Sequence, residues 1–419
     1  MRVAFKTIGC RLNQFETDSL ITRFKENGIE IVNSFADSDA VIINTCTVTS
    51  KSDYKSRNII KKAIKENPNA IVIVTGCYAE TDAETIKAIR GVDYVINNEN
   101  KSRVMDILLK HQSLEESKIS GHVFDFPAPV KGIHTRAYLK VQDGCDNYCS
   151  YCKVAIARGI EKSRDISSVI YDFNKIISAG IKEIVLTGVN TGSYQSGIES
   201  LLKSLLTISG DFRIHISSIE MRYVNSVLIE IFKNPQICYH LHIPLQSGSD
   251  KILKKMNRKY SKEQFLNMVK NIKHELPCIN LTTDVIVGFP GETDEDFNHT
   301  LDVIKESEFS HIHTFKYSPR KGTKAYSFKD DVPEDVKKSR SFTIRELSKT
   351  NLIGYKQKFI NKPLQVLIET MIKVEGKDYS KGKCREYFDV LIPGEYKNNQ
   401  NINCIGRKFL NENFIADIL

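Results

Sequence analysis

Three closely spaced cysteines carry the strongest chemical signal in this sequence. Cys145, Cys149 and Cys152 stand in GCDNYCSYC with the spacing C-x3-C-x2-C, after a strand-like run. Thiolates are the usual ligands of iron–sulfur clusters, and close spacing lets one loop wrap one cluster. Three ligands on a four-iron cluster leave one iron open, and an open metal position can bind a small molecule. The spacing therefore predicts a cluster with a vacant coordination position.

A structural zinc loop, or simply buried thiols, is the alternative for this segment. Zinc in structural sites takes four ligands, and no fourth cysteine or histidine lies close by in the sequence. Tyr151 directly precedes the third cysteine, where an aromatic ring could pack on a bound cofactor. These features favour the iron–sulfur interpretation.

Three more cysteines are scattered through the first part of the chain. Cys10, Cys46 and Cys77 each follow a strand-like run, in VAFKTIG, AVIINT and AIVIVTG. The carboxyl ends of the strands in an open α/β sheet share one edge, and ligands bind at that edge. Core packing is the alternative for any single cysteine. Three thiols at equivalent strand ends predict that these cysteines also hold a cluster.

The elements that must position these cysteines fall into three series. Residues 1–110 alternate strand and helix patterns, which predicts a small open α/β (Rossmann-like) sheet, and residues 111–135 look like a linker. Six further β/α repeats follow, too few for a closed barrel of eight, so they predict a partial (β/α)6 barrel. After Pro363 short strands alternate with turns, as in a small β-barrel or sandwich. The expected fold class is α/β, with domains at 1–120, 130–355 and 356–419.

Composition and charge narrow the class of protein. The 419 residues are 41% hydrophobic, enough for two or three packed domains. The net charge of +9 permits a polyanionic partner such as RNA without establishing one. No secretory signal or membrane-length apolar stretch is visible, so we expect a cytoplasmic protein. Thiols stay reduced there, and the ten cysteines indicate metal binding more than disulfides.

The motif C-x3-C-x-aromatic-C in a partial barrel resembles the radical S-adenosylmethionine superfamily. In that superfamily the open iron binds the amino and carboxylate groups of S-adenosylmethionine, and one electron cleaves it to a 5′-deoxyadenosyl radical. The motifs GCRLNQ (9–14), NTCTVT (44–49) and TGCYA (75–79) extend the likeness to the methylthiotransferase family over the whole chain. That family implies an auxiliary-cluster domain, a radical barrel and a small RNA-binding (TRAM-like) β-domain.

The resemblance also implies cofactor contacts at the ends of the barrel strands. The segment 187–190 looks like the one that receives the methionyl amino group, and the segment 217–220 offers a carboxylate for the ribose. The segment 285–292 would meet adenine through its backbone. Any single glycine here could be only a turn residue, but barrels place chemistry at this face. The implied cofactor-binding residues are Tyr151, Thr187, Gly188, Asn190, Ser218, Glu220, Gln246, Val287 and Gly288.

The wording of the first-domain motifs is most similar to the branch acting on N6-threonylcarbamoyladenosine in tRNA. The resemblance implies two [4Fe-4S] clusters, S-adenosylmethionine, and transfer of a methylthio group to C2 of the modified adenosine at position 37. It implies a tRNA anticodon stem-loop and an external one-electron reductant as partners, a monomer, and no membrane. The basic stretch from Lys337 to Lys358 could contact the tRNA or be a solvated helix face packed on the barrel. No side chain is assigned as general acid or base.

Two other classes of function remain open. The same chemistry could act on isopentenyl-adenosine in tRNA or on an aspartate of a ribosomal protein. Alternatively, the chain could be a non-catalytic RNA-binding protein with structural metal sites, which would hold zinc. The sequence departs from the family pattern at KVAIARG (153–159), at Met221 and at CREYFDV (384–390). Arg136, Arg158 and Arg164 flank the cysteine loop and could contact phosphate or the cofactor carboxylate, or form salt bridges.

Overall fold

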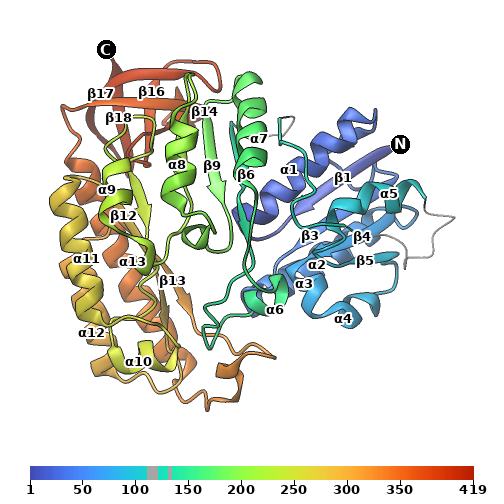
Figure 1. Ribbon diagram of the computed structural model, residues 1–419, viewed down its shortest axis with the longest axis horizontal. Helices are drawn as coiled ribbons and strands as arrows, with labels where there is room; N and C mark the ends of the chain where they lie inside the picture. The colour runs from blue at the N-terminus through green and yellow to red at the C-terminus, as the bar shows by residue number, and fades with distance from the viewer. Residues whose placement is uncertain (111–120, 131–134) are drawn as a thin grey trace. The chain divides into compact units, whose positions relative to one another are not determined.

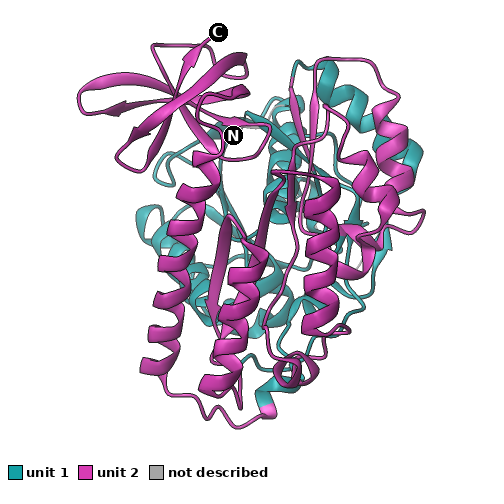
Figure 2. Ribbon diagram, turned by 90° about the vertical axis from the view of Figure 1, so that its left-hand side faces the viewer, with its two compact units in different colours: residues 1–180, 186–190, 318–326 teal, residues 181–185, 191–317, 327–419 magenta. Residues whose placement is uncertain are grey.

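The computed structural model describes residues 1–110, 121–130 and 135–419, and the expected linker at 111–135 lies partly outside these ranges. The described chain forms two compact units (Figure 2). Unit 1 comprises Met1–Gly180, Leu186–Asn190 and Ser318–Tyr326, and unit 2 comprises the remaining described residues. The three-domain division of the sequence stays a prediction beside this two-unit division.

Unit 1 is built on a parallel sheet with the strand order β2-β1-β3-β4-β5 (Figure 1). All six residues of β3 are buried, as expected for a parallel strand covered on both faces. The strands are β1 (Arg2–Thr7), β2 (Glu30–Val32), β3 (Ala40–Thr45), β4 (Ile71–Gly76) and β5 (Tyr94–Ile96). The helices are α1 (Arg11–Glu26), α2 (Ser50–Glu66), α3 (Cys77–Thr81), α4 (Ala83–Lys87) and α5 (Val104–Leu109), with the 3-10 turn η1 (Lys101–Arg103).

Gly76, at the end of β4, shows why this edge of the sheet is so closely packed. Its φ is +99°, and a Cβ at this position would lie 2.3 Å from Thr45 O. A side chain would meet both backbone strain and a clash with the neighbouring strand. Glycine thus lets the chain turn directly from β4 into the helix that begins at Cys77.

The rest of unit 1 contains the loop with Cys145, Cys149 and Cys152. Val141 N, just beyond β6, donates to Thr187 O at 2.9 Å, and Asp165 caps α7 by accepting from the backbone of Ser167 and Ser168. The elements are β6 (Arg136–Lys140), β7 (Gln142–Asp143), α6 (Val154–Arg158), β8 (Lys162–Ser163) and α7 (Ile166–Ser178); β9 (Glu183–Thr187) is divided between the units.

Unit 2 carries the later strands and helices of the β/α series. Strands β11, β12 and β13 form a parallel sheet in that order. The strands are β10 (Arg213–Ile216), β11 (His240–His242), β12 (Asn280–Val287) and β13 (His311–Lys316). The helices are α8 (Ile198–Leu206), α9 (Ser226–Ile231), α10 (Asp250–Lys255), α11 (Lys262–Glu275), α12 (Asp294–Ser307) and α13 (Glu334–Gln357), with 3-10 turns η3 (Thr191–Ser193), η4 (Met221–Tyr223) and η5 (Lys324–Ser327).

The C-terminal segment is a closed barrel in the order β14-β15-β16-β18-β17 (Figure 1). Val366, Ile368, Val390 and Phe414 are fully buried in its core, and closure leaves no unpaired sheet edge. This observation decides between the barrel and the sandwich. The strands are β14 (Pro363–Val374), β15 (Lys377–Cys384), β16 (Asp389–Pro393), β17 (Asn401–Leu410) and β18 (Asn413–Ile418).

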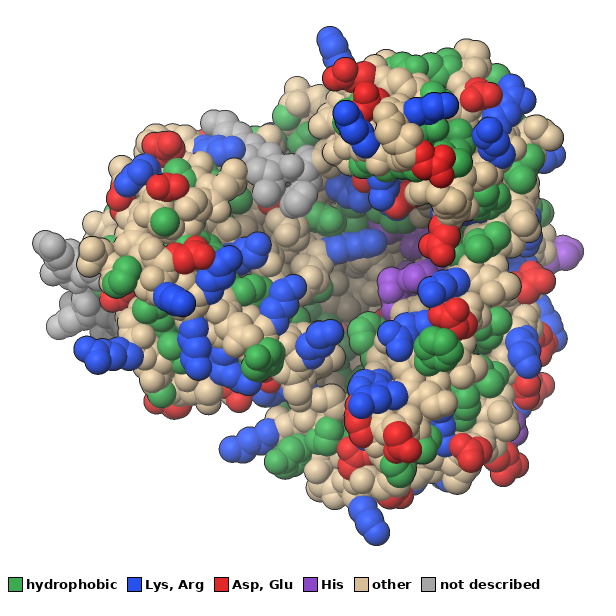
Figure 3. All heavy atoms as spheres, turned by 180° about the vertical axis from the view of Figure 1, so that it is seen from behind, with side chains coloured by type: hydrophobic (Ala, Val, Ile, Leu, Met, Phe, Trp, Pro, Cys, Tyr) green, Lys and Arg blue, Asp and Glu red, His purple; other side chains and the backbone are tan. Residues whose placement is uncertain are grey.

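The predicted fold class is confirmed: a parallel α/β sheet, a β/α series and a small β-barrel follow one another along the chain. Across the described ranges, every helix is too short or too polar to span a bilayer. On the face shown in Figure 3, lysine and arginine side chains are interspersed with aspartate and glutamate. The modest positive charge is therefore spread among opposite charges on that face.

Candidate cluster sites

The first cysteine set lies at three neighbouring strand ends of unit 1. Cys10 lies between β1 and α1, Cys46 directly follows β3, and Cys77 begins α3 after β4. These three strands are adjacent and parallel, so their carboxyl ends share one edge. A Cβ at Gly9 would lie 2.9 Å from Cys46 Sγ. The structure thus brings together the residues around Cys10 and Cys46 that the sequence separates.

The ionisation of Cys46 is governed mainly by its burial. Burial raises the pKa of Cys46 to about 12, and Cys10 and Cys77 act in the same direction. Within the described ranges, no three His, Cys, Asp or Glu side chains are grouped closely enough to hold one metal ion. The thiol of Cys46 therefore needs a positive charge or an electrophilic ligand to become a thiolate at neutral pH.

The second cysteine set lies in the same compact unit. Cys145, Cys149 and Cys152 are all partly exposed. Cys145 N donates to Gly159 O at 3.1 Å, and Cys152 N donates to Cys149 O at 3.0 Å, so backbone bonds fold the loop back on itself. All six sequence-predicted cysteine ligands thus belong to unit 1.

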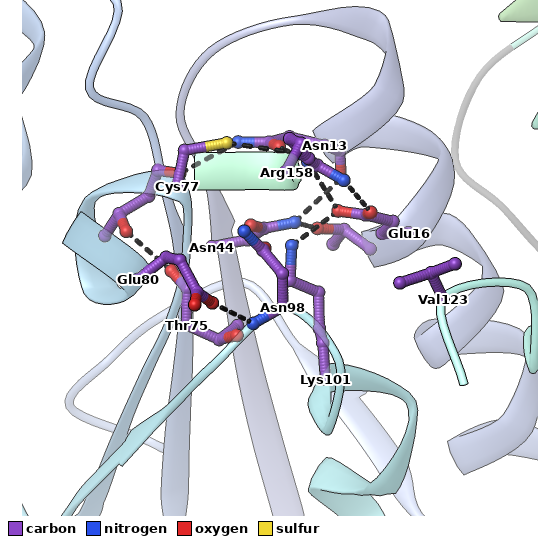
Figure 4. A network of polar contacts seen from close by, with 12 residues as sticks. Asn13, Glu16, Asn44, Thr75, Cys77, Glu80, Asn98, Lys101, Val123 and Arg158 are labelled. Atoms are coloured by element: carbon purple, nitrogen blue, oxygen red, sulfur yellow. Dashed lines mark hydrogen bonds and ion pairs between the residues drawn. The ribbon is translucent and has the colours of Figure 1, made fainter. Parts of the chain in front are cut away.

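Arg158, at the end of α6, contacts a cysteine of the other set (Figure 4). Its Nε donates to Cys77 Sγ at 3.3 Å. Its Nη2 donates to Asn13 Oδ1 at 2.6 Å, and its Nη1 ion-pairs with Glu16 and, at 3.2 Å, with Asp143. The guanidinium is therefore anchored on several sides while it faces the sulfur.

Glu16 lies at the centre of a buried network of opposite charges. Its carboxylate ion-pairs with Lys101 at 2.6 Å and Lys140 at 3.2 Å, in addition to Arg158. Burial alone would raise the pKa of Glu16, but Arg158, Lys101 and Lys140 outweigh it and hold the pKa well below its usual range. Lys140 also ion-pairs with Asp143 at 2.5 Å. The network keeps its members charged inside the protein.

Asn13 connects this network to the strand ends. Its Nδ2 donates to Ile8 O at 2.8 Å and to Thr45 O at 2.9 Å. These carbonyls lie at the ends of β1 and β3, beside Cys10 and Cys46. Helix α1 therefore turns polar side chains, rather than an apolar stripe alone, toward the sheet edge.

The segment Ser318–Tyr326 belongs to unit 1 and contacts both cysteine regions. Arg320 Nη2 donates to Thr47 O at 2.8 Å and ion-pairs with Asp53 at 2.7 Å. Ala325 N donates to Ser150 O at 2.7 Å. The segment thus braces the residue after Cys46 and the residue after Cys149.

Lys153, one of the departures from the family pattern, has a defined partner. Its Nζ lies 2.6 Å from Asp82 Oδ2, in the turn after α3. Burial would raise the pKa of Asp82, but the hydrogen bond and charge of Lys153 lower it. Asn98 Nδ2 also donates to Ala157 O at 2.6 Å. The segment 153–159 is therefore held against the first domain at Asp82 and at Asn98.

The sequence-predicted cofactor residues are divided between the two units. Thr187, Gly188 and Asn190 lie in unit 1 with Tyr151. Asn190 N donates to Gln142 Oε1 at 2.8 Å, which fixes this segment beside β7. Tyr151 is partly buried in the cysteine loop.

The other cofactor residues lie at the strand ends of unit 2. Both carboxylate oxygens of Glu220 are held by the Arg258 guanidinium. Gln246 N donates to Asp284 O at 2.8 Å, and Gly288 N donates to Glu292 Oε2 at 2.6 Å. Ser218 O accepts from Thr191, and Val287 is the fully buried last residue of β12.

The basic helix α13 uses part of its charge internally. Lys337 Nζ ion-pairs with Asp330 at 2.6 Å. Arg340 ion-pairs with Glu292 at 2.6 Å and with Asp294 at 2.7 Å. At Lys337 and Arg340 the charges of α13 are thus used in ion pairs within unit 2, which fits the alternative of a helix packed on the barrel better than contact with tRNA at these two positions.

Several residues of the unit 1 network escape the sequence analysis. Lys101, Lys140 and Asp143 each look like ordinary surface charges. The signal that could have found two of them is the charged pair within RAYLKVQDG, an otherwise apolar strand pattern. Asn13 and Glu16 similarly lie on α1 just after Cys10, at the helical spacing that places them on one face.

Two family models match this chain. Residues 139–304 match the radical SAM superfamily, and residues 2–97 match a model described as "Uncharacterized protein family UPF0004". The first match contains Cys145, Cys149 and Cys152, and the second contains Cys10, Cys46 and Cys77. Each cysteine set thus falls within its own matched region.

Solved structures of low sequence identity share the fold. The radical S-adenosylmethionine methyltransferase TsrM from Kitasatospora setae, bound to cobalamin and a [4Fe-4S] cluster, superposes with a TM-score of 0.56 at 14% identity. The match covers 75% of this chain and 74% of TsrM. The radical enzyme OxsB gives 0.52 at 14% identity, over 83% of this chain and 57% of OxsB.

Relatives with curated names match over nearly the whole chain. A protein of Bacillus subtilis named threonylcarbamoyladenosine tRNA methylthiotransferase MtaB is 40% identical, covering 94% of this chain and 90% of that protein. Its namesake from Thermotoga maritima is 36% identical, over 95% and 92%. A tRNA-2-methylthio-N(6)-dimethylallyladenosine synthase from Endomicrobium trichonymphae is also 36% identical, over 97% and 94%. With this coverage and both cysteine sets in place, the chain belongs to the MtaB-type family of radical S-adenosylmethionine methylthiotransferases.

Proposed function

We propose that this chain converts N6-threonylcarbamoyladenosine at position 37 of tRNA to its 2-methylthio derivative, acting as a monomer with two [4Fe-4S] clusters. The observation that carries the proposal is the membership of all six cysteines in one compact unit, three at a sheet edge and three in one loop. The names of the relatives support the substrate. The tRNA anticodon stem-loop and an external one-electron reductant are the proposed partners.

Cys10, Cys46 and Cys77 are the proposed ligands of the auxiliary cluster. Their surroundings fit an anionic group: the Arg158 guanidinium faces Cys77. Thr75 Oγ1 is buried without a hydrogen-bond partner among the described residues, so a donor is available two residues before Cys77. When bound, this cluster would supply an open iron for the sulfur to be transferred.

Cys145, Cys149 and Cys152 are the proposed ligands of the second cluster, which would bind and cleave S-adenosylmethionine. The proposed cofactor contacts are Tyr151, Thr187, Gly188, Asn190, Ser218, Glu220, Gln246, Val287 and Gly288. Arg258 immobilises the Glu220 carboxylate, which leaves its remaining lone pairs free to accept from hydroxyl groups such as those of a ribose. The backbone N–H groups of Asn190 and Gly288 donate to side-chain oxygens and so fix the segments 187–190 and 285–292.

The second candidate function is the same chemistry on tRNA that carries dimethylallyladenosine. It is supported by the 36% identity to a synthase of that name. The two functions share every cluster ligand, so only the choice of substrate separates them.

One experiment tests both the chemistry and the substrate. The protein is reconstituted anaerobically, analysed for iron, zinc and sulfide, and supplied with S-adenosylmethionine, a reductant and tRNA carrying either modification. We expect about eight irons per chain, release of 5′-deoxyadenosine, and methylthio product on the threonylcarbamoyl tRNA alone. Product on the dimethylallyl tRNA alone would support the second candidate. Stoichiometric zinc without sulfide would overturn the enzyme proposal and leave a structural metal protein.

A further inference from the structure

Arg158 connects the two cysteine sets in a way that neither cysteine motif explains. It follows Cys152 on the same loop and helix, yet its Nε donates to Cys77 Sγ. Resting on the proposed function, we infer that Arg158 is a positioning residue that sets the reduction potential of the cluster held by Cys10, Cys46 and Cys77.

The Arg158 guanidinium is connected, directly or through Asn13, to the ends of the three strands that precede the cysteines. The guanidinium contacts Cys77 directly, and its Nη2 donates to Asn13 Oδ1 at 2.6 Å. Asn13 in turn donates to the carbonyls of Ile8 and Thr45, which lie beside Cys10 and Cys46. Arg158 is therefore linked directly to Cys77 and, through the Asn13 amide, to the ends of β1 and β3; Figure 4 shows its contacts with Cys77 and Asn13.

The charges around Arg158 are balanced only when the sulfur is anionic. The buried network contains two carboxylates, Glu16 and Asp143, and three cations, Lys101, Lys140 and Arg158. It thus carries one positive charge in excess before the sulfur is counted. An uncompensated buried charge is strongly destabilising. A thiolate at Cys77, free or bound to iron, restores neutrality.

The excess positive charge has a consequence for electron transfer. When a cluster accepts one electron from the external reductant, its net charge becomes more negative by one unit. A nearby cation and an N–H···S hydrogen bond stabilise the reduced form more than the oxidised form, which raises the potential. Removal of Arg158 should lower the potential. Removal of a negative charge from the same network should raise it.

Arg164 provides a matched control for this inference. It lies in the same unit, is as buried as Arg158, and is also ion-paired, with Asp172 of α7 at 2.6 Å. Replacing it tests the effect of losing a buried arginine as such.

The test uses the full chain with Cys145→Ala, Cys149→Ala and Cys152→Ala as the parent, so that only the first set can hold a cluster. Arg158→Gln, Arg158→Lys, Glu16→Gln and Arg164→Gln are added singly. After anaerobic reconstitution, iron and sulfide are counted and the midpoint potential is measured by a redox titration followed by electron paramagnetic resonance. For Arg158→Gln we expect at least a tenfold fall in the ratio of reduced to oxidised cluster at a fixed potential, which is about 59 mV for one electron. Glu16→Gln should shift the midpoint in the opposite direction, and Arg164→Gln should leave it at the parent value.

The outcomes are distinguishable. The inference is overturned if Arg158→Gln holds its full iron content and keeps the midpoint potential of the parent. It is also overturned if Arg158→Gln and Glu16→Gln shift the midpoint potential in the same direction. Loss of iron from a folded Arg158→Gln chain, with iron retained in Arg164→Gln, would overturn the inference, because Arg158 would then hold the cluster rather than set its potential. Arg158→Lys keeps the charge and loses the Nε–H donor, so it should lower the midpoint less than Arg158→Gln. If Arg158→Gln does not fold, Glu16→Gln decides: a raised midpoint supports the inference, and a parent midpoint overturns it. A parent without any cluster would overturn the proposed function itself, and the inference with it.

Discussion

Arg320 Nη2 donates to both oxygen atoms of Thr47, at 2.8 Å to the carbonyl and 2.7 Å to Oγ1. Thr47 directly follows Cys46, while Arg320 lies far along the chain, beyond β13. A late segment of the sequence therefore holds an early cysteine in place. The contact explains why Ser318–Tyr326 clusters with unit 1.

This contact predicts that Arg320 protects Cys46 from solvent. Arg320→Ala leaves Asp53 without its ion pair and frees the Thr47 loop, and we expect a loss of about 2–3 kcal/mol in local stability. Each 1.4 kcal/mol of easier opening is about tenfold in the exposed population. The measurement is the alkylation rate of Cys46 in the cluster-free chain, read by mass spectrometry. Lys321→Ala, at an exposed neighbour, is the control, and equal rates in the two variants would contradict the prediction.

Asp18 predicts a pH dependence of stability. Burial raises the pKa of Asp18 to about 7, and the hydrogen bond from Gln14 lowers it only in part. The unfolded carboxyl ionises near its ordinary value of 3.8, so the folded chain holds an extra proton between that value and about 7. Folding stability must then fall as pH rises through this window and level off above it.

The size and the control of this effect follow from the same linkage. A shift of this size corresponds to about 4 kcal/mol at pH 8 relative to a group with no shift. Asp18→Asn keeps the acceptor for Gln14 and removes the titration. We expect its urea midpoint to exceed that of the parent at pH 8 and to approach it at pH 5. Parallel pH profiles for the two proteins would contradict the assignment.

The strand-end placement of the cysteines illustrates what the sequence alone can predict. Apolar runs that end at Gly9, Thr45 and Gly76 indicate parallel strands, and parallel strands share an edge. This local pattern suffices to place Cys10, Cys46 and Cys77 at strand ends that share one sheet edge; the adjacency of the three strands comes from the structure. The barrel or sandwich choice at the C-terminus needed the structure, because short alternating strands fit both.

The buried charges illustrate what the sequence cannot predict. Glu16, Lys101 and Lys140 each have a residue type that is almost always exposed, and only their mutual contact makes burial possible. That contact joins α1, η1 and β6, elements whose packing no local period encodes. The position of Arg320 beside Thr47 is likewise a long-range contact without a sequence signal.

The hairpin at CREYFDV, where the sequence departs from the family pattern, predicts a docking role within unit 2. Arg385 donates to Ile237 O and Asn234 O, both at 3.0 Å, and Tyr387 stacks on His215 with ring centroids 3.7 Å apart. Arg385→Ala removes the side-chain donor from both carbonyls and leaves Asn234 O with only the backbone N–H of Ile237. We expect a loss of about 2 kcal/mol and faster proteolysis between α13 and β14.

The control for this prediction lies on the same closed barrel. Arg407 forms an exposed ion pair with Asp417 at 3.0 Å, and such pairs contribute about 0–1 kcal/mol. Arg407→Ala should therefore retain the urea midpoint and the proteolysis rate of the parent. If Arg385→Ala behaves in the same way, the hairpin does not dock through this arginine.

The pair Glu220 and Arg258 predicts how S-adenosylmethionine affinity is controlled. Arg258 holds both carboxylate oxygens of Glu220, and its own side chain is almost fully buried. If Glu220 accepts from the ribose as proposed, Glu220→Gln removes a charge-assisted hydrogen bond, which is worth about 1.5–3 kcal/mol and so at least about tenfold in affinity. Arg258→Gln should weaken binding as well, because the carboxylate loses its fixed orientation.

The coupling between the two residues makes this prediction specific. Arg258 acts through Glu220, so the double variant should bind S-adenosylmethionine no more weakly than Glu220→Gln alone. Equilibrium dialysis of the anaerobically reconstituted protein measures the three affinities, and Arg222→Gln, at an exposed position beside Glu220, is the control. Additive losses in the double variant would show that Arg258 contacts the cofactor independently. If Glu220→Gln binds S-adenosylmethionine with the affinity of the parent, Glu220 does not contribute to the proposed ribose site.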